Sequence, residues 1–216
     1  MARQAGTVTA PAVALIALAG AVALADWVAV WRRPSRAETW LKPLTLVLLI
    51  AAAVALDPAD GAQRAWFVVG LVLSLAGDVL LLPAVDRFVP GLVAFLLAHV
   101  AYIAGFWHHG APNADARILA VLLLAPVAAV VVRAVRRSEP ELVVPVVVYI
   151  AVIAAMVASA LRYGDGAGIA GAALFAVSDS TLAIDRFDRR RRWGPTAVMV
   201  TYHLAQALLV VSLLES

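Results

Sequence analysis

Long apolar segments separated by short polar ones run along the whole chain. Each apolar segment has about the 20 residues that an α-helix needs to cross a hydrocarbon layer roughly 30 Å thick. Charged and turn-forming residues fill the gaps, as in "RRPSR" (32–36) and "DRRRRWGP" (188–195). The pattern predicts eight transmembrane helices, at about 11–31, 41–57, 65–83, 88–108, 117–134, 141–161, 168–185 and 194–213. We therefore expect an all-α, polytopic membrane protein with a single integral membrane domain over 1–216.

Composition agrees with this pattern. Hydrophobic residues make up 64% of the 216 residues, and the mean hydropathy is +0.94, whereas soluble domains are only about 45–50% apolar. The net charge of +3 could suggest nucleic acid, but the chain has no RNA-reading motif, and basic residues in membrane proteins usually record topology. We expect no nucleic-acid partner. The absence of cysteine excludes disulfides, iron–sulfur clusters and a cysteine nucleophile.

Basic residues are distributed unevenly between the two sides of the predicted bundle. The loops after the first, third, fifth and seventh helices hold 13 of the 17 basic residues, and the others are Arg3, Arg64, Arg117 and Arg162. The positive-inside rule places those loops in the cytoplasm and both termini on the non-cytoplasmic side of the cell (inner) membrane. "VALAD" (22–26) resembles a signal-peptidase site, but cleavage there would leave "RRPSR" outside, against the charge distribution.

Ionisable side chains at membrane depth are costly, and by default they mark a functional site. With a rise of 1.5 Å per residue, Asp78 and Asp179 lie about 20 Å and 16 Å from the outer ends of their helices. Residues that only hold helices together would be scattered in depth, whereas these cluster between the midplane and the inner face. The clustering predicts one polar cavity open toward the inner leaflet. The other residues at this depth are Asp26, His99, Tyr149, Tyr202 and His203.

The two aspartates occur in similar segments. "GLVLSLAGD" (70–78) aligns with "GAALFAVSD" (171–179) without a gap, and "DRF" follows each segment. Small residues allow helices to approach closely in lipid, so we expect these two helices to pack together with the aspartates facing each other. The similarity also raises the hypothesis of a parallel 4+4 repeat, in which helices one to four and five to eight form equivalent halves.

Paired carboxyl groups suggest acid–base chemistry. Two of them facing each other at low dielectric cannot both ionise cheaply, so one keeps its proton. An acid beside a base can protonate a substrate and activate water with no metal, cofactor or covalent intermediate. Asp78 and Asp179 are therefore the candidate catalytic residues. Polar residues on nearby helix faces are candidates for binding substrate or water: His99, Tyr102, Tyr149, Ser178, Tyr202, His203 and Gln206.

Other kinds of site fit less well. The chain has no serine-hydrolase elbow, P-loop or H-E-x-x-H motif, and "LAGD" (75–78) lacks the first glycine of the presenilin-like motif. The two aspartates with His99 and His203 could hold zinc, although their spacing does not require it, and we favour a metal-independent site. A proton-coupled transporter of a small amphiphile also fits the aspartates and the repeat, but the Gly/Pro-interrupted helix pair of such sites is missing.

Six segments, in the same order and over most of the chain, resemble the YhhN family, the lysoplasmalogenases. They are "LKPLTLVLLI" (41–50), "GLVLSLAGDVLLL" (70–82), "FLLAHVAYIAGF" (95–106), "PVVVYIAVIAAMV" (145–157), "GAALFAVSDSTLAIDRF" (171–187) and "VTYHLAQALLVVS" (200–212). The resemblance implies an eight-span hydrolase that cleaves the vinyl ether bond of lysoplasmalogens, giving a fatty aldehyde and glycerophosphocholine or glycerophosphoethanolamine. It places the two aspartates proposed as catalytic at Asp78 and Asp179. His203 departs from the family pattern, where a second tyrosine is expected after Tyr202.

Vinyl ether hydrolysis suits a carboxyl pair. Protonation of the alkenyl β-carbon gives an oxocarbenium ion, which water captures. One aspartic acid would donate that proton, and the other would stabilise the cation and deprotonate the water. Lys42, at the inner mouth, is a candidate to hold the substrate phosphate or to snorkel to the interface, and "DRRRRW" (188–193) is interpreted as a topology anchor. The expected partners are a lysophospholipid substrate and membrane lipid.

Overall fold

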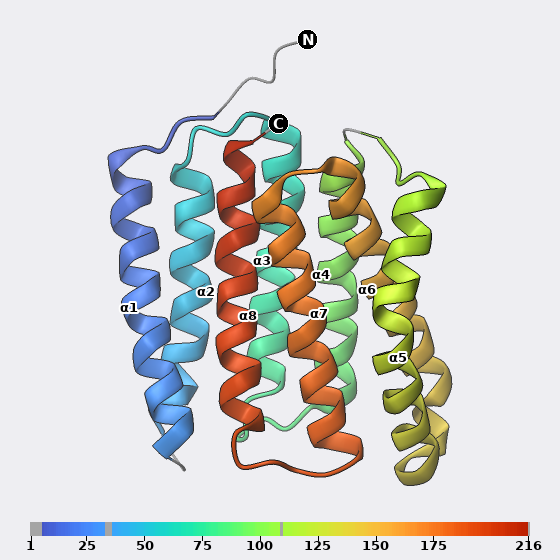
Figure 1. Cartoon of the computed structure of the whole chain (residues 1–216). Helices are drawn as coiled ribbons and strands as arrows, with labels where there is room; N and C mark the ends of the chain where they lie inside the picture. Colours follow the sequence, from blue (N-terminus) through green and yellow to red (C-terminus); the bar gives the residue numbers. More distant parts are fainter. Residues whose placement is uncertain (1–5, 33–35, 109, 216) are drawn as a thin grey trace.

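The computed structural model describes residues 6–32, 36–108 and 110–215, and within them the chain forms eight long α-helices (Figure 1). Every one of the eight is long and apolar enough to cross a membrane, which confirms the predicted all-α, multi-pass architecture. Their bounds are α1 Ala10–Arg32, α2 Glu38–Ala55, α3 Gly61–Leu80, α4 Phe88–Trp107, α5 Ala114–Ser138, α6 Val143–Tyr163, α7 Gly166–Phe187 and α8 Gly194–Val211. Two short 3₁₀ helices, Pro140–Leu142 and Ser212–Leu214, lie next to α6 and α8.

Side-chain caps fix the starts of three of these helices. Asp60 accepts hydrogen bonds from the first backbone N–H groups of α3, Asn113 from one in α5, and Asp165 from two in α7. Such a cap typically stabilises a helix by about 1 kcal/mol. Gly164 ends α6 with φ 82°, a left-handed conformation that glycine adopts without steric cost.

Helices that follow each other in the chain pack as antiparallel pairs. The most extensive packing is between α3 and α4 and between α7 and α8, followed by α1 with α2 and α5 with α6. In Figure 1, α7 and α8 lie in front of α3 and α4, with α1 and α2 on one side and α5 and α6 on the other. The aspartate-bearing helices α3 and α7 therefore both lie in the centre of the bundle, in two different layers.

The expectation that α3 and α7 pack together is wrong. α3 packs on α2 and α4, whereas α7 packs on α8, α5 and α6. The glycines explain the difference, because aromatic rings of α4 occupy the space that they leave. A Cβ on Gly70 would lie 2.6 Å from the Tyr102 ring, and one on Gly77 would lie 2.6 Å from the Phe95 ring. The small residues of α3 thus accommodate α4.

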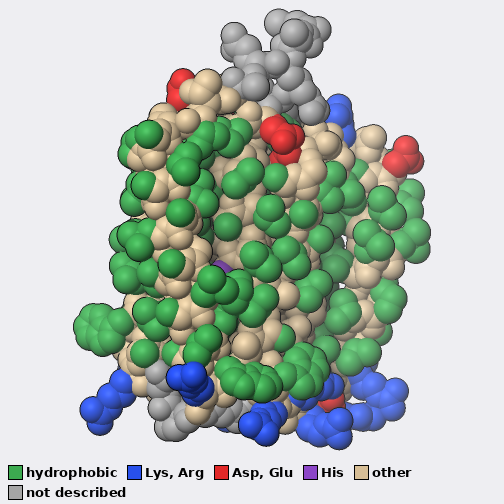
Figure 2. All heavy atoms as spheres, turned by 60° about the vertical axis from the view of Figure 1, so that its left-hand side comes forward, with side chains coloured by type: hydrophobic (Ala, Val, Ile, Leu, Met, Phe, Trp, Pro, Cys, Tyr) green, Lys and Arg blue, Asp and Glu red, His purple; other side chains and the backbone are tan. Residues whose placement is uncertain are grey.

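The two ends of the bundle differ in charge. Figure 2 shows apolar side chains over the lateral surface, with most of the lysine and arginine in view at one end. This basic end carries the described basic residues of the four arginine-rich loops, and its assignment to the cytoplasm remains a prediction. Arg3 and Arg33, which the sequence-based charge distribution included, lie outside the described residues.

Candidate active site

Asp78 is fully buried in α3 and is paired with a cation. Its Oδ1 lies 3.2 Å from Nζ of Lys42 in α2, and both side chains are at most 7% exposed. The Tyr202 hydroxyl of α8 donates a hydrogen bond of 2.8 Å to Oδ2. Lysine and aspartate neutralise each other at this point, so the arrangement favours an ionised Asp78.

Asp179, in α7, has different partners. The Tyr149 hydroxyl of α6 donates a 2.6 Å hydrogen bond to its Oδ2, and Nε2 of His99 in α4 lies 3.5 Å from the same oxygen. Nδ1 of His99 lies 2.6 Å from the Phe95 carbonyl, which can only accept, so Nδ1 carries a proton. Nε2, which has no hydrogen-bond partner in the described protein, therefore presents a lone pair toward Asp179, where a proton on the carboxyl group would find an acceptor.

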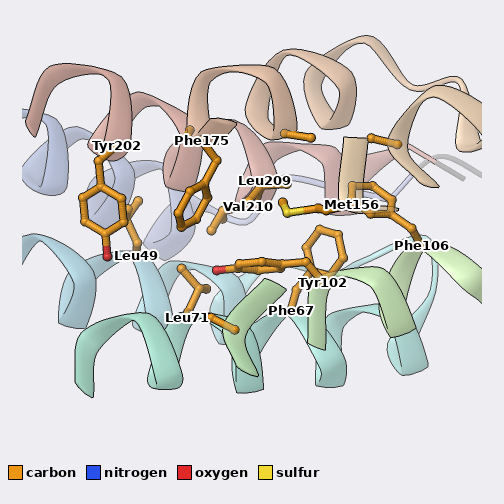
Figure 3. Packing of buried hydrophobic residues seen from close by; sticks show 14 of the residues in the cluster. Leu49, Phe67, Leu71, Tyr102, Phe106, Met156, Phe175, Tyr202, Leu209 and Val210 are labelled. Atoms are coloured by element: carbon orange, nitrogen blue, oxygen red, sulfur yellow. The ribbon is translucent and has the colours of Figure 1, made fainter. Parts of the chain in front are cut away.

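The two carboxyl groups do not contact each other, contrary to the expectation that they face one another. Every interaction that the structure gives to Asp78 or Asp179 is with a residue other than the second aspartate. The ring of Phe175 connects the two groups, with its centroid 5.5 Å from that of Tyr202 and 4.5 Å from that of His99. Figure 3 shows Phe175 and Tyr202 side by side in the core. The site thus consists of two carboxyl groups joined by an aromatic layer.

The contacts of the two aspartates follow one scheme. Asp78 contacts the second helix of the chain through Lys42 and the eighth through Tyr202. Asp179 contacts the sixth helix through Tyr149 and the fourth through His99. Each aspartate therefore uses the second helix of its own half of the chain and the last helix of the other half. This is the pattern that a 4+4 repeat predicts, and the repeat itself stays a prediction.

An apolar groove reaches Asp179 from the basic end. Tyr149, Asp179 and Ser180 supply its polar wall, and the rest is made by apolar side chains of α4, α5, α6 and α7, among them Leu92, Val127, Val131, Ile150 and Leu182. Phe88 and Phe187 line it where α4 begins and α7 ends. A groove of this kind accommodates a hydrocarbon chain. Asp78, by contrast, is 0% exposed and is absent from this lining.

The other predicted site residues divide between the two groups and the core. The Tyr102 hydroxyl donates to Oε1 of Gln206 at 2.6 Å, in a fully buried pair. Ser178 donates to the Val198 carbonyl and so holds α7 against α8. His203 forms no hydrogen bond with either aspartate, since its Nδ1 accepts a 3.1 Å hydrogen bond from the Trp27 indole and its Nε2 has no partner in the described protein. Of the four residues considered for zinc, only His99 and Asp179 lie next to each other, and the described residues form no group of three or more His, Cys, Asp or Glu that could hold a metal ion.

Comparison with known proteins identifies the family. The model of the YhhN family matches residues 37–213. The chain belongs to the YhhN family. The match includes both aspartates and their four polar partners, Lys42, His99, Tyr149 and Tyr202, and it confirms the resemblance drawn from the six segments.

Several curated relatives of this YhhN protein are named lysoplasmalogenases. Human lysoplasmalogenase TMEM86B is 37% identical over 68% of this chain and 62% of its own length. The Mycobacterium tuberculosis lysoplasmalogenase is 38% identical over 66% and 58%, respectively, and the pig TMEM86B is 30% identical over 85% and 78%. The chain thus matches about 60% of the length of the first two relatives. No solved structure matches it.

The YhhN match begins after α1, yet α1 adds a buried polar group that the sequence-based site did not include. Asp26 is 0% exposed, and neither of its carboxyl oxygens has a hydrogen-bond partner in the described protein. Glu38, Lys42 and Asp78 are near enough to act on it electrostatically. Nε2 of His203 is likewise buried without a partner. The depth of Asp26 was the available signal, and it placed the residue at the level of the other polar side chains.

Proposed function

We propose that this YhhN protein is a lysoplasmalogenase, which hydrolyses the vinyl ether bond of lysoplasmalogens to a fatty aldehyde and glycerophosphocholine or glycerophosphoethanolamine. The observation that carries the proposal is a carboxyl group, Asp179, in the wall of an apolar groove that suits an alkenyl chain. The names of the curated relatives support the substrate class. We place the enzyme in the cell membrane, with the basic end in the cytoplasm and the termini outside.

In this proposal Asp179 is the acid. It lines the groove, Tyr149 holds its Oδ2 in place, and Nε2 of His99 lies 3.5 Å from that oxygen as the acceptor toward which a protonated Asp179 would point. Asp179 donates that proton to the alkenyl β-carbon, which leaves an oxocarbenium ion beside a newly formed carboxylate. The negative charge stabilises the cation where it develops, which is the largest contribution that such a site makes to catalysis.

Asp78 is the base in the same scheme. Lys42 keeps it ionised, and the buried atoms of Asp26 and His203 that lack protein partners form a polar region suited to holding water near it. Asp78 takes up, through water held in that region, the proton lost by the water molecule that adds to the oxocarbenium carbon, giving a hemiacetal. The hemiacetal collapses to the aldehyde as that proton passes to the departing glycerol oxygen, and the proton of the hemiacetal hydroxyl returns to Asp179. The cycle needs no metal or cofactor.

The test is aldehyde release by the purified protein from a 1-alkenyl lysophospholipid, with the saturated 1-alkyl analogue as the unreactive control. Asp179→Asn should abolish release, because the amide keeps the shape of the carboxyl but cannot donate an acidic proton to carbon. An unchanged thermal unfolding profile shows that the fold is intact. Full activity of Asp179→Asn would refute the assignment. A wild-type protein that releases no aldehyde but carries out proton-coupled uptake in liposomes would favour the transporter.

A further inference from the structure

An arginine sits at the basic end of the apolar groove. The guanidinium carbon of Arg186, in the last turn of α7, lies 5.1 Å from the ring centroid of Phe88 and 5.6 Å from that of Phe187, and both rings line the groove. Nη2 of Arg186 also lies 2.8 Å from Glu139. The ion pair and the two rings hold the guanidinium at the groove, yet the side chain is still 46% exposed. Arg186 therefore presents a fixed cation with donors left over for an anion.

Arg186 is also in register with Asp179. The two residues are seven positions apart in α7, which corresponds to about two helical turns and roughly 10 Å along one face. In a lysoplasmalogen, about seven bonds separate the phosphorus from the alkenyl β-carbon, and such a chain spans roughly 8 Å when extended. A phosphate bound at Arg186 would therefore bring the reactive carbon to the carboxyl group of Asp179.

We propose that Arg186 is the phosphate-binding residue of the substrate site, and this inference rests on the proposed function. Lys42 was a candidate phosphate ligand from the sequence, but its ammonium is buried against Asp78 and could bind phosphate only by leaving that carboxylate uncompensated. Arg186 has the geometry that phosphate prefers, because guanidinium donates parallel hydrogen bonds to two oxygens. The head group then stays at the polar boundary of the membrane, and only the glycerol and the alkenyl chain enter the groove.

The test compares a substrate with a phosphate to one without it. With 1-alkenyl-glycerophosphocholine, Arg186→Gln should raise KM by about tenfold or more and leave kcat nearly unchanged, because the charged contact is made equally in substrate and transition state. With 1-alkenylglycerol, which lacks phosphate, the variant and the wild type should behave alike. Arg186→Lys, which keeps the charge, should raise KM for the phosphate-containing substrate less than Arg186→Gln does. Arg190→Gln removes the same charge from the same end at an exposed position and should leave both substrates unaffected.

A binding measurement separates this inference from the proposed function. The non-reactive 1-alkyl lysophosphatidylcholine should bind the wild type, and Arg186→Gln should weaken its binding by a similar factor whether or not the protein releases aldehyde. If Arg190→Gln raised KM or weakened binding as much as Arg186→Gln does, only the total charge of the basic end would matter, and the inference would be overturned. An Arg186→Gln variant with wild-type KM and wild-type affinity would overturn it as well.

Discussion

The buried ion pair of Lys42 and Asp78 gives the sharpest test of the two-carboxylate scheme. The pair is separated by 3.2 Å, with side chains only 7% and 1% exposed. Removing one partner of such a pair typically costs about 3–5 kcal/mol, because a buried charge is left uncompensated. Replacing both by uncharged residues is often close to neutral. Asp78→Asn and Lys42→Met should therefore each destabilise the protein strongly, whereas the double variant should regain much of the loss.

Activity should behave differently from stability. If Asp78 deprotonates the attacking water, the double variant Lys42→Met/Asp78→Asn folds but releases no aldehyde. The measurements are thermal unfolding in detergent and aldehyde release for the two single variants, the double variant and the wild type. Near wild-type release by the double variant would refute the reasoning, because it would make the pair a structural element alone. If the double variant were no more stable than Asp78→Asn, the instability of Asp78→Asn would not come from the unpaired charge of Lys42, and the ion-pair reasoning would be wrong.

Three further changes test the geometry of the site. Tyr149→Phe removes the hydroxyl that donates to Asp179 and should lower kcat by about tenfold or more in the aldehyde assay, without unfolding the protein. Val127→Phe narrows the apolar groove and should raise KM more for long alkenyl chains than for short ones, as a comparison of substrates of different length would show. Gly70→Ala forces a methyl group against the Tyr102 ring and should cost about 1–3 kcal/mol in thermal unfolding, whereas Gly20→Ala, where no atom lies within 4 Å, should not destabilise.

The eight helices could be predicted from the sequence because the thickness of the bilayer fixes how many apolar residues a span requires. The depth of the polar residues followed from the same rule, and it placed Asp78 and Asp179 with His99, Tyr149 and Tyr202 between the midplane and the inner face, and Lys42 at the inner mouth. The sequence did not predict which helices are neighbours. Spaced glycines indicate that another helix packs closely at that face, but they do not identify the helix. At Gly70 the neighbour is the Tyr102 ring of α4, and α7 is elsewhere.

The roles of the cations were hidden for a related reason. Lys42 and Arg186 both lie toward the basic end. The positive-inside rule explains a basic residue at either position, so the sequence gives no reason to assign them different roles. The structure separates them by their contacts. Lys42 is buried against a carboxylate in the neighbouring helix, whereas Arg186 is half exposed beside two rings of the groove. The sequence shows that each residue is charged, but it does not show which residue forms an ion pair with it.

The pairing of Lys42 with Asp78 also affects how the chain enters the membrane during synthesis. An aspartate at the centre of a spanning helix opposes insertion by roughly 2.5–3.5 kcal/mol. Lys42 precedes Asp78 by a single helix hairpin, so the counter-ion is already made when α3 leaves the ribosome. Tyr202, in contrast, belongs to α8, the last of the long helices to be synthesised. α2 and α3 can therefore insert as a hairpin whose buried charges cancel, long before α8 completes the site around Asp78.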